Sequence, residues 1–340
     1  MLTRRAFLGA LGATTLAALS ACSGSDKGTD STGAPSASGS SSAAFRIAVI
    51  APSAEDDAAF SQSMFDAVDA LAKDSTVGPV EVTRAPGLFQ VDEAAAAIER
   101  YASEGYDLVI AHGSQYGASV AAAAKKHPKV SFAWGTATDT FGLPNVFGYD
   151  AAAGEGGYVL GVIAATLNPA RLAAIGPVEV GDAKAFIRGF TRGALSVLPD
   201  VPVDVEYTGT FSDAKAFRTA ADKAVAAGAT VFTGSSQGVA GAIPIIEGAG
   251  GLWFGTQANQ TSLSPKATVA SQVYHWERVL RDIVNKVRAG ELGGSVFELT
   301  LANGGLQIEY NDGYELDPAA KAAGDATIAA VMSGKVTVGA

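Results

Sequence analysis

The sequence predicts an α/β protein with two doubly wound lobes. From residue 45 onward, short runs rich in β-branched residues alternate with alanine-rich stretches, as in βα units around a parallel sheet. This alternation occurs in two successive series along the chain. The 319 residues that follow residue 21 are enough for two domains of ordinary size, and the hydrophobic content of 48% fits a packed body.

The first series predicts a lobe over residues 45–150. The helix expected after its first strand carries Phe60, Met64, Val68 and Leu71 at helical spacing. The expected strands are 45–51, 79–84, 107–112, 130–134 and 145–148, and the expected helices are 57–73, 92–104 and 115–126.

The second series predicts another lobe over residues 151–267. Residues 268–340 are less regular and are expected to cross between the lobes and complete both. They are predicted to contain a helix over 274–289 and a strand pair over 296–309 around Asn303-Gly304-Gly305. The helices expected in the second series are 154–167, 182–197, 213–227 and 238–248, and the strands are 171–176, 203–208, 229–233 and 252–256.

Two strand-loop-helix segments echo each other in the two series. Residues 107–117 contain an apolar strand followed by Gly-Ser-Gln, and residues 230–238 contain a strand followed by Gly-Ser-Ser-Gln. In open α/β sheets, ligands bind beyond the carboxyl ends of the strands, where such loops lie. We therefore expect the two loops to face each other across a cleft. A chance repeat in a chain with 40 glycines is the alternative.

Residues 1–21 have the three parts of a secretory signal peptide: Arg4 and Arg5 at the start, an apolar stretch over 7–19, and small residues before position 22. The apolar stretch is too short to span a bilayer permanently. Residues 3–8 also resemble a twin-arginine export signal, which would carry the protein across the membrane already folded. Both export routes stay open.

Cys22 is the only cysteine, so the chain forms no intramolecular disulfide. Leu19-Ser20-Ala21-Cys22 resembles the lipobox, at which bacterial lipoprotein signals are cut after lipid attaches to the cysteine thiol. The resemblance implies a lipid anchor on Cys22 at the outer face of the bacterial cell membrane, and a buried core thiol is the alternative. Residues 22–44 are predicted to form a disordered tether, because their small and polar side chains cannot offset the entropy of ordering.

The charge pattern argues against nucleic acid as a partner. The formal net charge of −10 becomes −12 once Arg4 and Arg5 are removed, and no basic cluster is larger than two consecutive lysines. His112 and His127 have no acidic or cysteine partners at metal-ligand spacing, so no metal site is predicted. The chain contains no Walker A motif, so an ATP-driven step would belong to a partner.

Residues 57–62 read Asp-Ala-Ala-Phe-Ser-Gln, and residues 154–161 read Gly-Glu-Gly-Gly-Tyr-Val-Leu-Gly. These motifs resemble the basic membrane protein family, the purine-nucleoside-binding lipoproteins that deliver substrate to ABC transporters. Residues 57–62 match the family's opening motif of an Asp followed three residues later by Phe-Asn-Gln, with Ser61 in place of the Asn. Residues 145–161 are similar to the family's central crossover and are the most specific match. Further similar stretches are 186–193, 207–213 and 255–260, and the likeness covers nearly all of residues 45–315.

The resemblance implies a type I periplasmic-binding-protein fold, in which three crossovers join two Rossmann-like lobes that close on one ligand. It implies a binding protein of an ABC importer that captures a small, nucleoside-like heterocycle and presents it to a permease and its ATPase. It implies no enzymatic activity and no cofactor, and the protein is expected to be monomeric. A surface sensor of the same fold, which passes its closed state to a receptor, is the alternative.

Two departures from the family bear on the ligand. The family usually has Gly-Val-Asp, whose carboxylate takes ribose hydroxyls, where this chain has Gly255-Thr256-Gln257. Glutamine carries no charge, so charge-assisted hydrogen bonds from this position are lost. A family lysine falls near Tyr274. A heterocyclic ligand with a different polar tail is therefore expected.

The opening motif supplies four candidate ligand contacts. Asp57 precedes a helical run, so its carboxylate is either an N-cap or an acceptor for a ligand's hydrogen bonds, and the two roles are compatible. Phe60 either stacks on a flat ligand or belongs to the core face of the helix. Ser61 and Gln62 complete the motif that the resemblance places at the ligand.

The two echoing loops supply more candidates. Ser114, Gln115 and Tyr116 place a hydroxyl, an amide and backbone donors at a helix start, with ordinary capping as the alternative. In the second lobe, Ser235 belongs to the loop that the resemblance places at the ligand. Phe232 is one residue out of register with the family's second stacking ring, so it fits the core equally well.

Three further positions complete the candidate site. Trp253 is a substitute for the second stacking ring, with core packing as the alternative. Trp134 ends an expected buried strand, and the same two alternatives apply to it. Gln257 takes the place of the family's aspartate, as described above.

One motif also fits an enzyme. Residues 234–238, Gly-Ser-Ser-Gln-Gly, satisfy the G-x-S-x-G pattern of a nucleophile elbow between a strand and a helix. With Ser236 as nucleophile, Glu247 and His275 would complete a triad in the chain order of an α/β-hydrolase. A serine hydrolase is thus the rival to a binding protein, although the pattern is short for a chain rich in Gly and Ser.

Overall fold

The computed structural model describes residues 44–338. The predicted signal at 1–21, the predicted lipid-attachment residue Cys22 and all but the last residue of the predicted tether lie outside the described residues. Within the part of the chain that is described, no helix is both long enough and apolar enough to cross a membrane.

The N-terminal lobe is built around a six-stranded sheet in which every pair of neighbours is parallel. The strand order is β11-β5-β4-β3-β1-β2. The strands are β1 (Phe45–Ile50), β2 (Val80–Ala85), β3 (Leu108–Ala111), β4 (Ser131–Gly135), β5 (Val146–Ala151) and β11 (Val296–Leu299).

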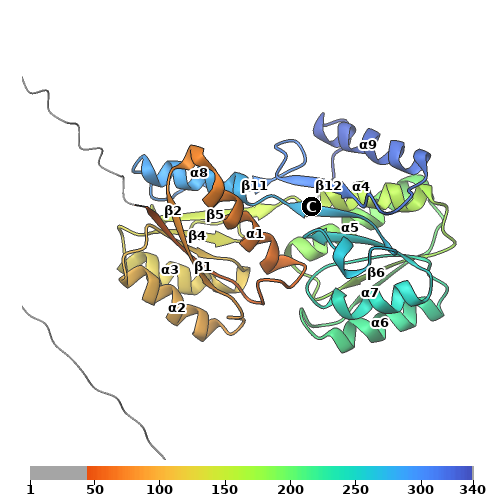
Figure 1. Cartoon of the computed structure of the whole chain (residues 1–340), viewed down its shortest axis with the longest axis horizontal. Helices are drawn as coiled ribbons and strands as arrows, with labels where there is room; N and C mark the ends of the chain where they lie inside the picture. The colour runs from red at the N-terminus through yellow and green to blue at the C-terminus, as the bar shows by residue number, and fades with distance from the viewer. Residues whose placement is uncertain (1–43, 339–340) are drawn as a thin grey trace, which may run out of the picture. The chain divides into compact units, whose positions relative to one another are not determined.

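Helices cover both faces of this sheet. Alternate residues of β1 enter different cores: Ile47 and Val49 pack on one face, and Ala48 and Ile50 on the other. Figure 1 shows α1 and α8 above the sheet and α2 and α3 below it. The helices are α1 (Phe60–Lys73), α2 (Val91–Ser103), α3 (Gly117–Lys126) and α8 (Glu277–Arg288), with single 3₁₀ turns η1 (Ser75–Val77) and η2 (Ser114–Tyr116).

The C-terminal lobe repeats this design around the strand order β12-β10-β9-β8-β6-β7, in which only β12 is antiparallel to its neighbour. The strands are β6 (Leu172–Gly176), β7 (Val203–Tyr207), β8 (Val231–Gly234), β9 (Leu252–Gln257), β10 (Thr268–Tyr274) and β12 (Leu306–Tyr310). The helices are α4 (Ala153–Thr166), α5 (Gly181–Val197), α6 (Ala214–Ala226), α7 (Val239–Gly248) and α9 (Pro318–Met332), and η3 (Thr261–Leu263) is a 3₁₀ turn.

The chain passes between the two sheets three times. It crosses from β5 to α4, from β10 to α8, and from β11 to β12. Figure 1 shows these segments running from one lobe to the other. Two parallel-stranded lobes with three crossovers form the type I periplasmic-binding-protein fold, which confirms the fold that the sequence predicts.

Residues 268–338 differ most from expectation. Both strands predicted over 296–309 form, but they do not pair with each other, because β11 joins the first sheet beside β5 and β12 joins the second beside β10. The intervening Asn303 side chain accepts hydrogen bonds from the backbone of Thr300 and Gly305, which shapes a crossover instead of a hairpin. Strand β10 and helix α9 were not predicted, and the helix expected from 274 begins at Glu277.

Helices α4 and α5 are in unusually close contact. Gly157 and Gly161 of α4 and Gly189 and Gly193 of α5 lie at the contact. A Cβ on either α4 glycine would overlap a backbone oxygen of α5, and a Cβ on either α5 glycine would overlap a backbone oxygen of α4. The four glycines therefore set the distance between α4, the helix after the first crossover, and α5.

Gly161→Ala is expected to lower the free energy of unfolding by about 1–3 kcal/mol, because the added methyl group must push the two helices apart. Gly248→Ala is the matched control, since Gly248 is an exposed helix residue with no atom within 4 Å of an added Cβ. This control should be neutral or stabilising by up to about 1 kcal/mol. Equilibrium urea unfolding measures both, and equal midpoints would contradict the packing argument.

Candidate ligand-binding cleft

A cavity lies between the lobes, where the carboxyl ends of strands from both sheets meet. Its walls enclose about 600 Å³, including the part that is open to solvent. The N-terminal lobe contributes residues that follow β1, β2, β3 and β4, and the C-terminal lobe contributes residues at or after the ends of β6, β7, β8 and β9. The lining residues are Pro52, Phe60, Phe89, Gly113, Ser114, Gln115, Thr136, Pro177, Val180, Gly181, Asp182, Ala183, Phe211, Ser235, Ser236, Gln237 and Gln257.

Three buried polar atoms in this wall have no hydrogen-bond partner in the described part of the protein. They are Ser235 Oγ, Ser236 Oγ and Gln257 Oε1. Leaving such an atom unpaired costs about 1–3 kcal/mol, so native structures rarely contain a group of them without a purpose. Hydroxyl and amide oxygens gathered in one cavity can pair with the polar groups of a small ligand.

The backbone is strained at the same place. Thr136, Ser236 and Gln257 have φ angles of 54°, 81° and 74°, a region that non-glycine residues rarely occupy. Each such residue costs on the order of 1–3 kcal/mol and persists only where the surrounding structure enforces it. Strain of this kind clusters at functional sites, which agrees with the position of the cavity.

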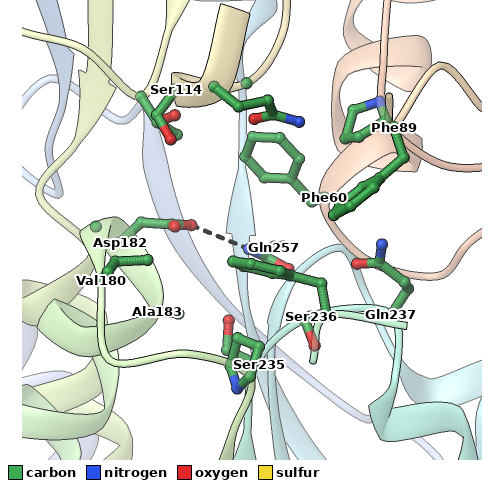
Figure 2. Close-up of a pocket in the computed structure, with 17 residues that line it drawn as sticks. Phe60, Phe89, Ser114, Val180, Asp182, Ala183, Ser235, Ser236, Gln237 and Gln257 are labelled. Atoms are coloured by element: carbon green, nitrogen blue, oxygen red, sulfur yellow. Dashed lines mark hydrogen bonds between the residues drawn. The ribbon is translucent and has the colours of Figure 1, made fainter. Parts of the chain in front are cut away.

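Asp182 is the one ionisable side chain among the described residues that line the cavity. It is the second residue of α5, and its Oδ2 accepts hydrogen bonds from Gln257 Nε2 at 3.0 Å and from Tyr274 Oη at 3.2 Å. Figure 2 shows the Asp182–Gln257 bond across the floor of the cavity. Burial raises the pKa of the Asp182 carboxyl, and the two hydrogen bonds counteract this in part.

Tyr274 stays a donor to this carboxylate. Burial raises the pKa of the Tyr274 hydroxyl well above its ordinary value, and the nearby Asp182 charge raises it further. The hydroxyl therefore keeps its proton at neutral pH. Two uncharged donors thus orient the Asp182 carboxyl, and no cation lies among the described residues that line the cavity.

Aromatic rings form the apolar part of the wall. Phe60 comes from the start of α1, Phe89 from the loop after β2, and Phe211 from the loop after β7. The rings of Phe89 and Phe211 belong to different lobes, and their centroids are 6.5 Å apart. Figure 2 places Phe60 and Phe89 opposite the Ser235 and Ser236 side of the cavity.

Five of the residues expected at the site from the sequence line the cavity. Phe60, Ser114 and Gln115 do so from the N-terminal lobe, and Ser235 and Gln257 from the C-terminal lobe. The expectation that the two Gly-Ser loops face each other is therefore met.

The other three residues of the opening motif lie beside the cavity and not on its wall. The Asp57 carboxylate accepts hydrogen bonds from the backbone of Ala59, Ser61 and Gln62 at 2.8–3.0 Å and from Ser53 Oγ at 2.6 Å. These four bonds occupy both oxygens of the carboxylate, so Asp57 caps the start of α1. Ser61 Oγ is paired with Ser53, and the Gln62 amide oxygen accepts from the backbone of Ala58.

Three predicted contacts lie in the protein core because their side chains point away from the cleft. Tyr116 is fully buried, and its hydroxyl donates to the Leu88 carbonyl oxygen. Phe232 packs in the core under α6 and α7, which is the outcome that its one-residue register difference allowed. Trp253 is also buried there, and its Nε1 donates to Gln260.

The rival triad is not assembled. Ser236 lines the cavity, but neither Glu247 nor His275 does. Glu247 accepts a hydrogen bond from Ser264, and His275 is bonded to Glu277. The structure therefore does not bring together the three residues that the hydrolase hypothesis required.

Asp182, Phe89 and Phe211 were missed in the sequence. The signal for Asp182 was present, because it follows a buried strand through a short loop and begins a helix, as Ser114 does. Phe89 lies in a loop without a repeated pattern, so no sequence signal distinguished it from other exposed rings. Phe211 lies in the stretch 207–213 that is similar to the family, which marked the segment but did not identify this ring as a contact.

Two α/β lobes joined by three crossovers, with a largely apolar cavity between them that carries a few polar groups, have the architecture of periplasmic binding proteins. The chain belongs to the family of PnrA-like ABC transporter substrate-binding proteins, whose family model matches residues 44–329.

Curated relatives share this assignment. The chain is 25% identical to an ABC transporter nucleoside-binding protein, BmpA, of Lactococcus lactis over 311 residues, which cover 83% of this chain and 85% of the relative. It is 30% identical to a purine-binding protein of Brucella abortus over 198 residues, which cover 58% and 56% of the two chains. These relatives are named as binding proteins, not as enzymes.

Solved structures support the fold. A solute-binding protein of an ABC transporter system from Conexibacter woesei has a TM-score of 0.73 at 22% identity, covering 86% of this chain and 98% of that chain. A solute-binding protein from Aeropyrum pernix has a TM-score of 0.74 at 17% identity, covering 86% and 92%. Identities this low show the shared fold alone.

The hinge contains a second perturbed carboxyl. Asp150 lies near the end of β5, just before the first crossover. Burial raises its pKa to about 6, and the carboxylates of Asp182 and Glu298 contribute in the same direction, while a hydrogen bond from the Ala151 backbone lowers it. Ionised Asp150 therefore destabilises the folded state.

Asp150→Asn is expected to stabilise the protein at pH 7.5 by up to about 3 kcal/mol, because a two-unit rise in pKa corresponds to that free energy. The destabilisation by Asp150 is complete above about pH 7 and is lost as pH falls through 6 toward 4, so the variant and wild type should converge near pH 4. Thermal unfolding across this range measures the difference. Asp312→Asn, an exposed aspartate, controls for loss of charge, and a constant Asp150→Asn effect at all pH values would refute the assignment.

Proposed function

We propose that this protein is a lipid-anchored substrate-binding protein of an ABC importer that captures an uncharged, nucleoside-like heterocycle between its lobes. The observation that carries this proposal is the composition of the cavity wall. It combines the Phe60 ring, unpaired polar atoms at Ser235, Ser236 and Gln257, and one carboxylate, Asp182. A flat ring bearing hydroxyl or amino groups complements such a wall.

The charge of the cavity argues for a nucleoside over a nucleotide. No lysine, arginine or histidine lies among the described residues of the wall, and its one ionisable group is the acidic Asp182. A phosphate group would enter a low-dielectric site without a cation and beside an acidic side chain, which is costly. The names of two relatives, a nucleoside-binding and a purine-binding protein, support the same ligand class.

The geometry suggests how each lobe contributes. Phe60, with Ser114 and Gln115 beside it, offers a ring face and polar atoms from the N-terminal lobe. Asp182 and Gln257 offer acceptors from the C-terminal lobe. A ligand that satisfies both sets links the lobes, so binding favours the closed arrangement.

Asp182 also bears on the departure at Gln257. The Gln257 amide nitrogen donates to Asp182, which leaves the Gln257 oxygen free to accept. The cavity thus retains a carboxylate although position 257 has lost one. We propose that Asp182 accepts hydrogen bonds from the ligand's hydroxyl or amino groups.

The remaining parts of the proposal rest on the sequence and the family. The signal at residues 1–21 directs export, and lipid on Cys22 with the tether of residues 22–44 holds the binding domain outside the cell membrane. A tethered receptor stays concentrated near the permease and ATPase to which it delivers ligand.

Adenosine, guanosine or inosine is expected to raise the melting temperature, whereas the corresponding monophosphates are not. A ligand present at 100 times its Kd adds about 2.7 kcal/mol of stability. Asp182→Asn should reduce the discrimination, because it removes the acidic group beside which a phosphate would lie. A thermal-shift screen with the wild type and this variant measures both effects. Equal shifts by nucleosides and monophosphates would contradict the charge argument, and no shift by any nucleoside would contradict the ligand class.

Phe60→Ala is expected to lower the affinity for the nucleoside identified by that screen by tenfold or more, since stacking and apolar contact with the ring are lost. Phe141→Ala is the control, because Phe141 is a partly exposed ring that stacks on Trp134 and does not line the cavity. Isothermal titration calorimetry gives both affinities. An unchanged affinity for Phe60→Ala would remove this ring from the site.

A further inference from the structure

A buried histidine lies directly behind the Phe60 ring. His112 follows β3, is fully buried, and does not line the cavity. Its ring is parallel to that of Phe60, with the centroids 3.9 Å apart and the planes inclined by 12°. His112 therefore covers the face of the Phe60 ring that is turned away from the ligand cavity.

Two hydrogen bonds fix the tautomer of His112, that is, which ring nitrogen carries the proton. His112 Nε2 lies 3.1 Å from the Phe60 carbonyl oxygen, which can only accept, so Nε2 carries the proton. His112 Nδ1 then accepts from the Tyr149 hydroxyl at 2.9 Å. Burial lowers the pKa of His112 to about 3, so the imidazole is neutral at physiological pH. One side chain thus holds both the ring and the backbone of Phe60.

The contacts continue into the hinge through Trp276. This residue lies in the second crossover, between β10 and α8, and is fully buried. Its ring packs edge-on against His112, Tyr149 and Tyr274, with centroid distances of 5.7, 5.2 and 5.4 Å. Its Nε1 donates to Ser63 Oγ on α1 at 3.0 Å, which ties the crossover to the helix that begins with Phe60.

Phe60, His112, Tyr149, Trp276 and Tyr274 form one aromatic cluster, which reaches the opposite wall of the cavity through Tyr274. Tyr274 packs against Trp276 and donates its hydroxyl to Asp182. A continuous set of buried contacts therefore runs from the Phe60 ring in one lobe to the Asp182 carboxylate in the other. It passes through the hinge and not through the cavity.

We propose that His112 is a positioning residue for the ligand site, which fixes the Phe60 ring and, through Trp276 and Tyr274, sets its place relative to Asp182. This inference rests on the proposed function, since it assigns how that site is kept in shape. It explains why a histidine is buried where no metal-binding group occurs among the described residues. A position that must stack, donate to a carbonyl and accept from a hydroxyl requires a neutral imidazole.

The role predicts a specific pattern of binding losses. His112→Gln keeps a donor and an acceptor but loses the ring. It should lower the affinity for adenosine, guanosine or inosine, whichever binds the wild type most tightly, by tenfold or more. In a Phe60→Ala background the same substitution should change affinity by less than twofold, because His112 acts through Phe60. An equal loss in both backgrounds would show that His112 does not act through the ring and would overturn the proposal.

Tryptophan variants separate positioning from general stability. Trp276→Phe and Trp253→Phe each remove one buried indole whose Nε1 is hydrogen-bonded, but only Trp276 belongs to the cluster. Both variants should have a lower melting temperature than the wild type, while only Trp276→Phe should have a lower affinity for the nucleoside, by threefold or more. Equal affinities for these two variants would contradict the proposed link through the hinge, even if His112→Gln fails to fold.

NMR of histidine-labelled protein tests the arrangement without a ligand. The His112 ring should keep its proton on Nε2 from pH 8 to 5, and its carbon-bound protons should be shifted upfield by the Phe60 ring. Phe60→Ala should remove that shift. A proton on Nδ1, or no effect of Phe60→Ala, would overturn the positioning role. If no nucleoside binds wild type but these signals are present, the ligand class fails while the arrangement behind Phe60 stands.

Discussion

The site depends on one geometric constraint: the parallel strands of both sheets end at the same surface between the lobes. Four strands from each lobe deliver their following loops to one cavity, so residues far apart in the chain, such as Phe60 and Gln257, become neighbours. Because backbone donors and acceptors inside each sheet are already paired, the polar groups that remain available are those in the loops. The unpaired side-chain oxygens lie at the same edge: those of Ser235 and Ser236 in the loop after β8, and that of Gln257 at the end of β9.

A site of this kind costs stability. The backbone is strained at Thr136, Ser236 and Gln257, and two carboxyls near the hinge, Asp150 and Asp182, have raised pKa values because burial disfavours their charged forms. Asp150 belongs to the first lobe and Asp182 to the second, so their mutual repulsion also acts between the lobes. A ligand that donates to Asp182 offsets part of this cost, which links binding energy to the relative position of the lobes.

The regular βα units could be predicted because their central strands are buried and apolar and most of their helices are amphipathic. Strand β10 escaped prediction since its Ser271 and Gln272 are buried polar side chains, which break the apolar pattern. At the site, loops with a repeated motif were predictable. Phe232 and Trp253 were candidates there for the family's second stacking ring, with core packing as the alternative. Rings on a strand between two helical layers more often serve the core, as both do here.

Asp182 shows why a single substitution in a family motif is a poor guide to chemistry. Read alone, glutamine at position 257 suggests that the site has lost its charge. In the folded protein, its amide nitrogen holds the carboxylate of Asp182, which arrives from α5 and is oriented from the other side by Tyr274. Tyr274, the other residue at which the sequence differs from the expected family pattern, donates to the same carboxylate. The two differences therefore act on one group, because both side chains orient Asp182, and the chemistry of this part of the wall depends on the pair and not on position 257 alone.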